Sequence, residues 1–93
     1  MAQTLNFDKQ SAAATKNREF NLAYIKHVEL YINEVLERKG YVYLNTIYEN
    51  LGFEWNPLWE NTVYIHEKEN PRWIMFDVNE FDVEEELTIT ILH

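Results

Sequence analysis

The residues best suited to chemistry in this chain are few and far apart. The three histidines, His27, His66 and His93, have no histidine partner four residues away, and the chain has no cysteine, so the sequence offers no zinc site. The single serine, Ser11, falls in a polar N-terminal stretch, and two glycines are too few for a glycine-rich phosphate loop. We therefore expect no catalytic residue, no metal and no cofactor, and a protein that is not an enzyme.

The acidic run DVNEFDVEEE, residues 77–86, raises the question of calcium. If Asp77 and Asn79 take the first two ligand positions of an EF-hand loop, Phe81 falls on the third ligand position. Asp82 then replaces the turn glycine, and Thr88 replaces the bidentate glutamate. The run therefore predicts either a solvated acidic loop or a contact surface for basic residues of a partner, and no metal site.

The segment FEWNPLWEN, residues 53–61, concentrates aromatic side chains around a proline and two asparagines, a composition typical of a loop. Trp55 and Trp59 can fold back and close the end of the core, as large aromatic side chains do in small domains. Alternatively, one of them stays exposed as an anchor, since tryptophan and tyrosine dominate binding hot spots. We expect Phe53 and one tryptophan to be buried. The other tryptophan is either buried as well or exposed as a binding anchor.

The elements that must position these residues fit within one domain. The chain has 93 residues, of which 46% are hydrophobic, and no disulfide is available to stabilise it. Its N-terminus lacks the basic and apolar regions of a signal peptide, and no apolar run approaches the roughly 20 residues that span a bilayer. We therefore expect a cytoplasmic protein with no membrane contact.

The charge of the chain is unevenly distributed. Residues 1–40 carry 5 acidic and 6 basic side chains, whereas residues 41–93 carry 11 acidic and 2 basic ones. The second part has a net charge of −9 and the whole chain −8. A field of this sign repels phosphate backbones and favours a basic protein partner, so we expect no direct binding of nucleic acid.

Apolar periodicity predicts one long helix after a flexible start. Residues 1–16 are polar and small without a period, so we expect a flexible N-terminal arm followed by a single domain over residues 17–93. From Asn17 to Gly40, apolar residues recur every three or four positions, which predicts an amphipathic helix capped by these two residues. The predicted apolar stripe comprises Phe20, Tyr24, Val28, Tyr31, Ile32, Val35 and Leu36.

The rest of the chain alternates strand and turn patterns. The predicted elements are a strand over 41–44, a two-turn helix from the cap Asn45 to Gly52, a β-hairpin of 62–68 and 73–78 with its turn at Asn70 and Pro71, and a strand over 87–92. We expect an α+β fold, in which the long helix packs on one face of a three- or four-stranded, mainly antiparallel sheet, with a short second helix.

Alternation along the strands predicts two faces of this sheet. One face is strongly apolar and should lie against the long helix; it comprises Val63, Ile65, Ile74, Phe76, Val78, Leu87, Ile89 and Ile91. The opposite face comprises Tyr64, His66, Trp73, Met75, Thr88 and Thr90. The N-terminal arm, the aromatic loop, a second copy or a foreign partner could cover this opposite face.

Three stretches of the chain, GYVYLNTIYENLGF, TVYIHEK and WIMFDVNEF, resemble a family of small, uncharacterised phage and prophage proteins of Gram-positive bacteria. The resemblance covers about residues 20–82 and implies a phage origin, without an assigned activity. The matching positions are Gly40, Tyr41, Leu44, Asn45, Tyr48, Leu51, Gly52, Phe76, Asp77, Val78 and Asn79.

Together these patterns favour a non-enzymatic, phage-like protein-interaction module. An acidic inhibitor of a host nucleic-acid enzyme, such as a restriction or CRISPR nuclease, is one version, with carboxylates in place of DNA phosphates. A homo-oligomeric structural or assembly component of a virion is the alternative, and a small hydrolase would require two converging carboxylates in a cleft. The predicted partner-binding residues are an aromatic patch of Trp55, Trp59, Tyr64 and Trp73 and an acidic rim of Glu80, Asp82, Glu84, Glu85 and Glu86.

Overall fold

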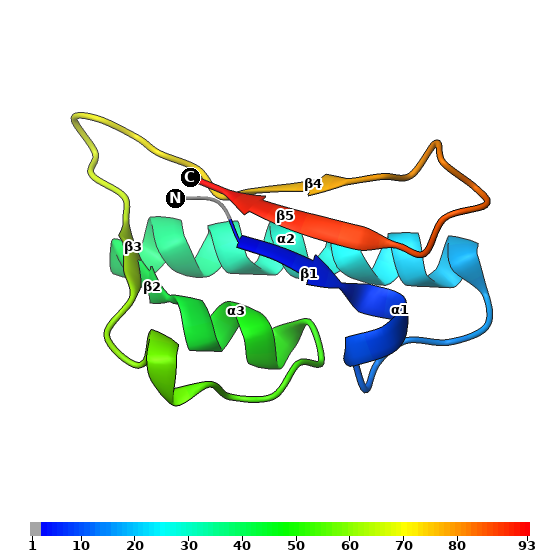
Figure 1. Cartoon of the computed structure of the whole chain (residues 1–93). Coiled ribbons are helices and arrows are strands. Elements are labelled where there is room, and N and C mark those ends of the chain that lie inside the picture. The colour runs from blue at the N-terminus through cyan, green and yellow to red at the C-terminus, as the bar shows by residue number, and fades with distance from the viewer. Residues whose placement is uncertain (1–2) are drawn as a thin grey trace.

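A three-stranded sheet, a two-stranded ribbon and one long helix make up the fold (Figure 1), which a computed structural model describes for residues 3–93. The sheet is antiparallel with the order β1-β5-β4, and β2 pairs with β3 in the separate ribbon. The predicted α+β class is confirmed. In chain order the elements are β1 (Gln3–Asn6), α1 (Phe7–Gln10), α2 (Arg18–Lys39), β2 (Tyr41–Tyr43), α3 (Leu44–Asn50), the 3₁₀ turn η1 (Pro57–Trp59), β3 (Val63–Ile65), β4 (Met75–Val78) and β5 (Thr88–Leu92).

The long helix α2 begins and ends where the sequence predicts. The side chain of Asn17 accepts a hydrogen bond from the backbone N–H of Phe20, and Gly40 closes the helix with φ of 83°. Phe20 and Tyr31, however, are exposed, although the predicted stripe includes both. The buried face is turned toward one side of that stripe and comprises Asn21, Ile25, Val28, Glu29, Ile32, Val35 and Leu36. Two polar residues therefore lie in the buried face, where periodicity alone does not place them.

The expected N-terminal arm is part of the fold from Gln3 onward, and residues 1–2 lie outside the described residues. β1 pairs with β5, the central strand of the sheet. The fully buried ring of Phe7 lies 6.1 Å from the ring of Tyr24 and 6.2 Å from that of Phe53, measured between centroids. A strand of four residues is too short to show a period, so long-range pairing decides its structure.

The predicted hairpin between residues 62–68 and 73–78 is not formed. β3 pairs with β2, and β4 pairs with β5, so the two strands belong to different sheets. Both segments have strand character, but the alternation of one strand does not specify its partner. As a consequence, Val63 and Ile65 are exposed instead of buried, while Tyr64 between them packs against the core. On the main sheet the predicted inward face is confirmed for Ile74, Phe76, Leu87, Ile89 and Ile91.

Side chains of α2 satisfy the free backbone edge of β4. Asn33 donates to the carbonyl of Ile74 and accepts from its N–H, both at 2.8 Å. Four residues earlier on the helix, Glu29 Oε2 accepts from the backbone N–H of Phe76 at 2.7 Å, and Oε1 accepts from Lys26 Nζ at 2.7 Å. Because unpaired backbone groups are costly when buried, these contacts take the place of a fourth strand.

The Asn33→Asp substitution tests this edge contact. A carboxylate still accepts from the Ile74 N–H but cannot donate to the Ile74 carbonyl, so we expect the free energy of unfolding to fall by about 1–3 kcal/mol. Urea denaturation followed by circular dichroism measures the change. Glu34→Gln, at the exposed neighbouring position, is the control and should leave the midpoint in place. Equal midpoints for both variants would contradict the assigned role of Asn33.

Candidate functional site

The connection between β4 and β5, residues 79–87, forms an acidic loop at the end of the molecule where α2 begins (Figure 1). The guanidinium group of Arg18, the first residue of α2, reaches into this loop. Its three shortest hydrogen bonds go to the backbone carbonyls of Asn79 at 3.1 Å, Asp82 at 3.0 Å and Glu85 at 2.9 Å. A longer one reaches the carbonyl of Glu80 at 3.4 Å. One side chain thus fastens both turns of the loop, residues 79–82 and 82–85, to the helix.

A cation in the first turn of a helix is electrostatically unfavourable, because the helix dipole is positive there. Arg18 occupies that position nevertheless, and its Nε is the one buried side-chain nitrogen or oxygen without a hydrogen-bond partner within residues 3–93. The three carbonyl contacts offset these costs, since hydrogen bonds to a charged group are each worth about 1.5–3 kcal/mol. The position of Arg18 is therefore explained by the loop and not by the helix.

Further contacts hold the acidic loop in one conformation. The side chain of Asn79 donates to the carbonyl of Glu86 at 2.9 Å and accepts from the N–H of Thr88 at 2.8 Å. Lys9 forms an ion pair with Glu86 at 3.2 Å, and the carboxylate of Asp8 accepts a hydrogen bond from the backbone N–H of Leu87 at 2.8 Å. Since the carbonyls are directed inward to Arg18, the loop is fastened through its backbone. The carboxylates predicted as an acidic rim, Glu80, Asp82, Glu84, Glu85 and Glu86, are all exposed.

The same loop presents two apolar side chains to solvent. Phe81 is 92% exposed and Val83 is 73% exposed. The sequence prediction assigned neither residue to the site, although both stand between acidic residues in a segment expected to be a loop. Their place in the acidic run is the signal that could have found them, because alternation over residues 80–84 is by itself the period of a strand. The loop thus combines an exposed aromatic ring with surrounding carboxylates on a fixed backbone.

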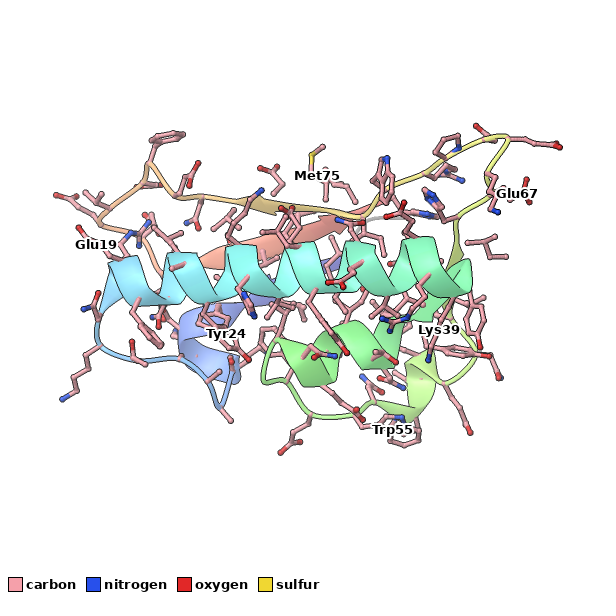
Figure 2. All side chains as sticks on the ribbon, turned by 180° about the vertical axis from the view of Figure 1, so that it is seen from behind. Glu19, Tyr24, Lys39, Trp55, Glu67 and Met75 are labelled. Carbon is pink, nitrogen blue, oxygen red and sulfur yellow. The ribbon has the colours of Figure 1, made fainter. Side chains whose placement is uncertain are left out.

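Trp55 and Trp59 lie in a different place, on a groove of about 680 Å³ between the aromatic loop and β1. Trp59 packs against the core. Trp55 is 50% exposed at the edge of the molecule (Figure 2). Asn45, predicted as a helix cap, instead fixes this loop through two hydrogen bonds to the backbone of Asn56. One tryptophan is therefore structural and the other is available for contact.

The two remaining residues of the predicted aromatic patch are separate from this groove. Trp73 is half exposed beside the ring of His66, and Tyr64 is half buried with its ring 4.9 Å from that of His93. Trp73 also lines a groove of about 430 Å³ between α2 and β4, whose far end is formed by Glu80. Trp73 and Glu80 therefore line a common groove. The other predicted residues lie in three places: Trp55 and Trp59 on the groove beside β1, Tyr64 on the β2–β3 ribbon, and the remaining acids on the acidic loop.

The ribbon of β2 and β3 has an apolar outer face that sequence analysis missed. In the ribbon Tyr41 lies opposite Ile65, and Tyr43 lies opposite Val63, and all four side chains are exposed. The alternation was visible in the sequence, but the predicted pairing of β3 with β4 turned Val63 and Ile65 inward. This face carries no charged side chain.

The chain belongs to a family of unknown function, DUF6353, whose sequence profile matches residues 1–91. No curated protein and no solved structure matches it. Within residues 3–93, no group of three or more histidine, aspartate or glutamate side chains could hold a metal ion. No helix of this described part is long and apolar enough to cross a membrane.

Arg18→Lys tests the loop contact. A lysine keeps the charge but cannot bridge three carbonyls, and the loss of one charged hydrogen bond of about 1.5 kcal/mol shifts a local opening equilibrium roughly 10-fold. We therefore expect a glutamate-specific protease to cleave within residues 80–86 about 10-fold faster. Arg38→Lys, at the other end of the same helix, should leave the cleavage rate unchanged. Equal rates for the two variants would show that Arg18 does not hold the loop.

The buried phenols predict a loss of stability at alkaline pH. Burial raises the pKa of Tyr48 and that of Tyr64 above the usual 10.0. The protonated phenols therefore contribute stability that is fully present below about pH 10 and is lost as the pH rises through the raised values. Thermal unfolding at increasing pH measures this loss, and the double variant Tyr48→Phe, Tyr64→Phe should show a flatter profile. A profile equally steep in the double variant would refute the assignment.

Proposed function

We propose that this protein is a non-enzymatic interaction module that docks through its acidic loop onto a partner protein with a basic surface. The observation that carries the proposal is the 92% exposure of Phe81 on a loop whose backbone Arg18 holds in place. A solvated loop without a partner would gain nothing from exposing a phenylalanine. It would also gain nothing from an arginine that fixes its shape.

The physical terms of such docking are favourable. Burial of a phenylalanine side chain contributes about 1.5–3 kcal/mol, and the surrounding carboxylates orient an approaching cationic surface. Because the loop is already ordered, little conformational entropy is lost on binding. The complementary partner surface is an apolar pocket with lysine or arginine side chains around its rim.

A nucleic-acid enzyme of a bacterial host, such as a restriction or CRISPR nuclease, is a partner class with this chemistry. Its DNA-binding groove is cationic, and the exposed carboxylates of the loop would occupy it in place of phosphates. In this form of the proposal the protein is an anti-defence inhibitor of phage origin that acts in the host cytoplasm. The net charge of −9 in residues 41–93 and the resemblance to phage proteins support it.

A homo-oligomeric assembly component of a virion is the second candidate. The observation that favours it is the uncharged outer face of the β2–β3 ribbon, with Tyr41, Tyr43, Val63 and Ile65 exposed together. Contiguous apolar side chains on a ribbon face are typical of contacts between proteins. A face without charges does not select a basic partner, so this candidate depends on a different surface from the first.

The loop proposal is tested by affinity capture with matched variants. The full chain, Phe81→Ser and Leu58→Ser are immobilised and incubated with bacterial lysate, and the retained proteins are identified by mass spectrometry. Leu58 is the control because it is also exposed, at 79%, but lies in η1. We expect a basic protein that the full chain and Leu58→Ser retain, that Phe81→Ser loses, and that high salt releases.

Binding of the purified partner is then measured by calorimetry. The Phe81→Ser substitution should raise its dissociation constant about 10-fold or more. If the partner is a nucleic-acid enzyme, duplex DNA should compete with the protein for it. Retention of the same proteins by Phe81→Ser and by the full chain would refute the loop as the docking element.

A further inference from the structure

A second surface of the molecule complements the acidic loop. At the C-terminal end of α2, a pocket of about 410 Å³ opens between the helix terminus and the connection from β3 to β4. Arg38, Lys39 and Lys68 supply three cations to its lining, against the single carboxylate of Glu37. The pocket therefore favours anionic groups, although the chain as a whole carries a net charge of −8.

The interior of this basic pocket is aromatic and fixed in position. The ring of Trp73 lies 4.3 Å from that of His66, measured between centroids. The backbone N–H of His66 donates to the carbonyl of Gly40 at 2.9 Å, and its Nδ1 accepts from the backbone N–H of Arg72 at 3.2 Å. Pro71 adds an apolar wall. A site of this kind accepts an aromatic side chain flanked by carboxylates.

The acidic loop and the basic pocket lie at opposite ends of α2. Arg18, the first residue of the helix, holds the loop, and Lys39, the last residue, lines the pocket. A helix of 22 residues is roughly 33 Å long, and the longest dimension of the molecule is 41 Å. Figure 2 shows Glu19 and Lys39 at the two ends of the helix. Contact between loop and pocket is therefore possible only between two molecules.

We infer that the acidic loop of one copy docks into the basic pocket of a second copy, so that the copies join head to tail. The inference rests on the proposed function, because it takes the acidic loop as the docking element and names its partner. Phe81 of one copy packs against Trp73 of the next. The carboxylates of the loop face Arg38, Lys39 and Lys68 of that second copy.

Charge complementarity selects contact between a loop and a pocket over contact between two like surfaces. Two acidic loops repel each other, as do two basic pockets, so a two-fold contact at either end is unfavourable. Loop against pocket brings opposite charges together and also buries the exposed ring of Phe81. Because the two contact surfaces differ, an open assembly has one unoccupied loop and one unoccupied pocket, so it extends into a chain or closes into a ring.

Sedimentation velocity of complementary variants tests the inference. The full chain should increase in mean mass with concentration and pass beyond a dimer. Phe81→Ser removes the loop contact and Lys68→Glu places a carboxylate in the pocket, so each should raise the apparent dissociation constant about 10-fold or more. An equimolar mixture should instead associate and stop at two chains. In that mixture Phe81→Ser supplies an intact pocket and Lys68→Glu an intact loop.

Two matched substitutions serve as controls. Leu58→Ser removes an exposed apolar side chain outside both surfaces, and Lys16→Glu makes the same charge change as Lys68→Glu at an exposed site before α2. Both should associate like the full chain. Circular dichroism confirms that each variant folds, which is expected because all four substituted side chains are exposed.

Three outcomes would overturn the inference. In the first, the full chain stays monomeric from micromolar to millimolar concentration. In the second, the mixture of Phe81→Ser and Lys68→Glu associates no better than either variant alone. In the third, both variants associate as strongly as the full chain. The last outcome would place the contact elsewhere, for example on the outer face of the β2–β3 ribbon. A monomeric full chain that still captures a partner through Phe81 would leave the proposed function standing. Only capture that Phe81→Ser leaves intact, or no capture by the full chain at all, refutes the proposed function itself.

Discussion

The rest of the structure depends on α2 satisfying backbone groups that short strands leave unpaired. β4 has four residues and a neighbour on one side only, and the loop that follows it directs its carbonyls inward. Asn33 and Glu29 complete the edge of β4, and Arg18 completes the loop. These three residues are separated by whole helical turns and lie on one face of α2, alongside Leu22 and Ile25 of the groove next to β4. A single helix face thus supplies both apolar contacts and the hydrogen bonds of a missing strand.

This arrangement connects the core to the surface that we propose as functional. A charged loop of this composition would repel itself and remain extended if its backbone were bonded only to water. Because the guanidinium of Arg18 collects three carbonyls, the carboxylates and Phe81 are left on the outside of an ordered loop. The basic pocket depends on the same helix, since Gly40 ends α2 where Arg38 and Lys39 flank the connection that carries Trp73. The length of α2 therefore sets the distance between the two surfaces.

The sequence predicts local structure well and long-range pairing poorly. Asn17 and Gly40 mark the ends of α2 because capping is determined by neighbouring residues. The partner of β3 and the place of residues 3–10 in the sheet depend on contacts far apart in the chain, which a period of two does not specify. The acidic run is recognisable as a surface from its composition alone. The role of Arg18 is not predicted by the sequence, because its carbonyl partners lie more than 60 residues away. Of the predicted aromatic patch, Trp55 and Trp73 are half exposed, but on separate surfaces.

The most direct test of this account is the mobility of the acidic loop in the unmodified protein, measured by ¹⁵N relaxation. If the contacts of Arg18 and Asn79 order the loop, the amides of residues 79–87 should have order parameters near those of α2, about 0.85. Order parameters below about 0.6 across the loop would show that it is flexible in solution. Such a result would contradict an ordered docking element and, with it, the function proposed for this surface.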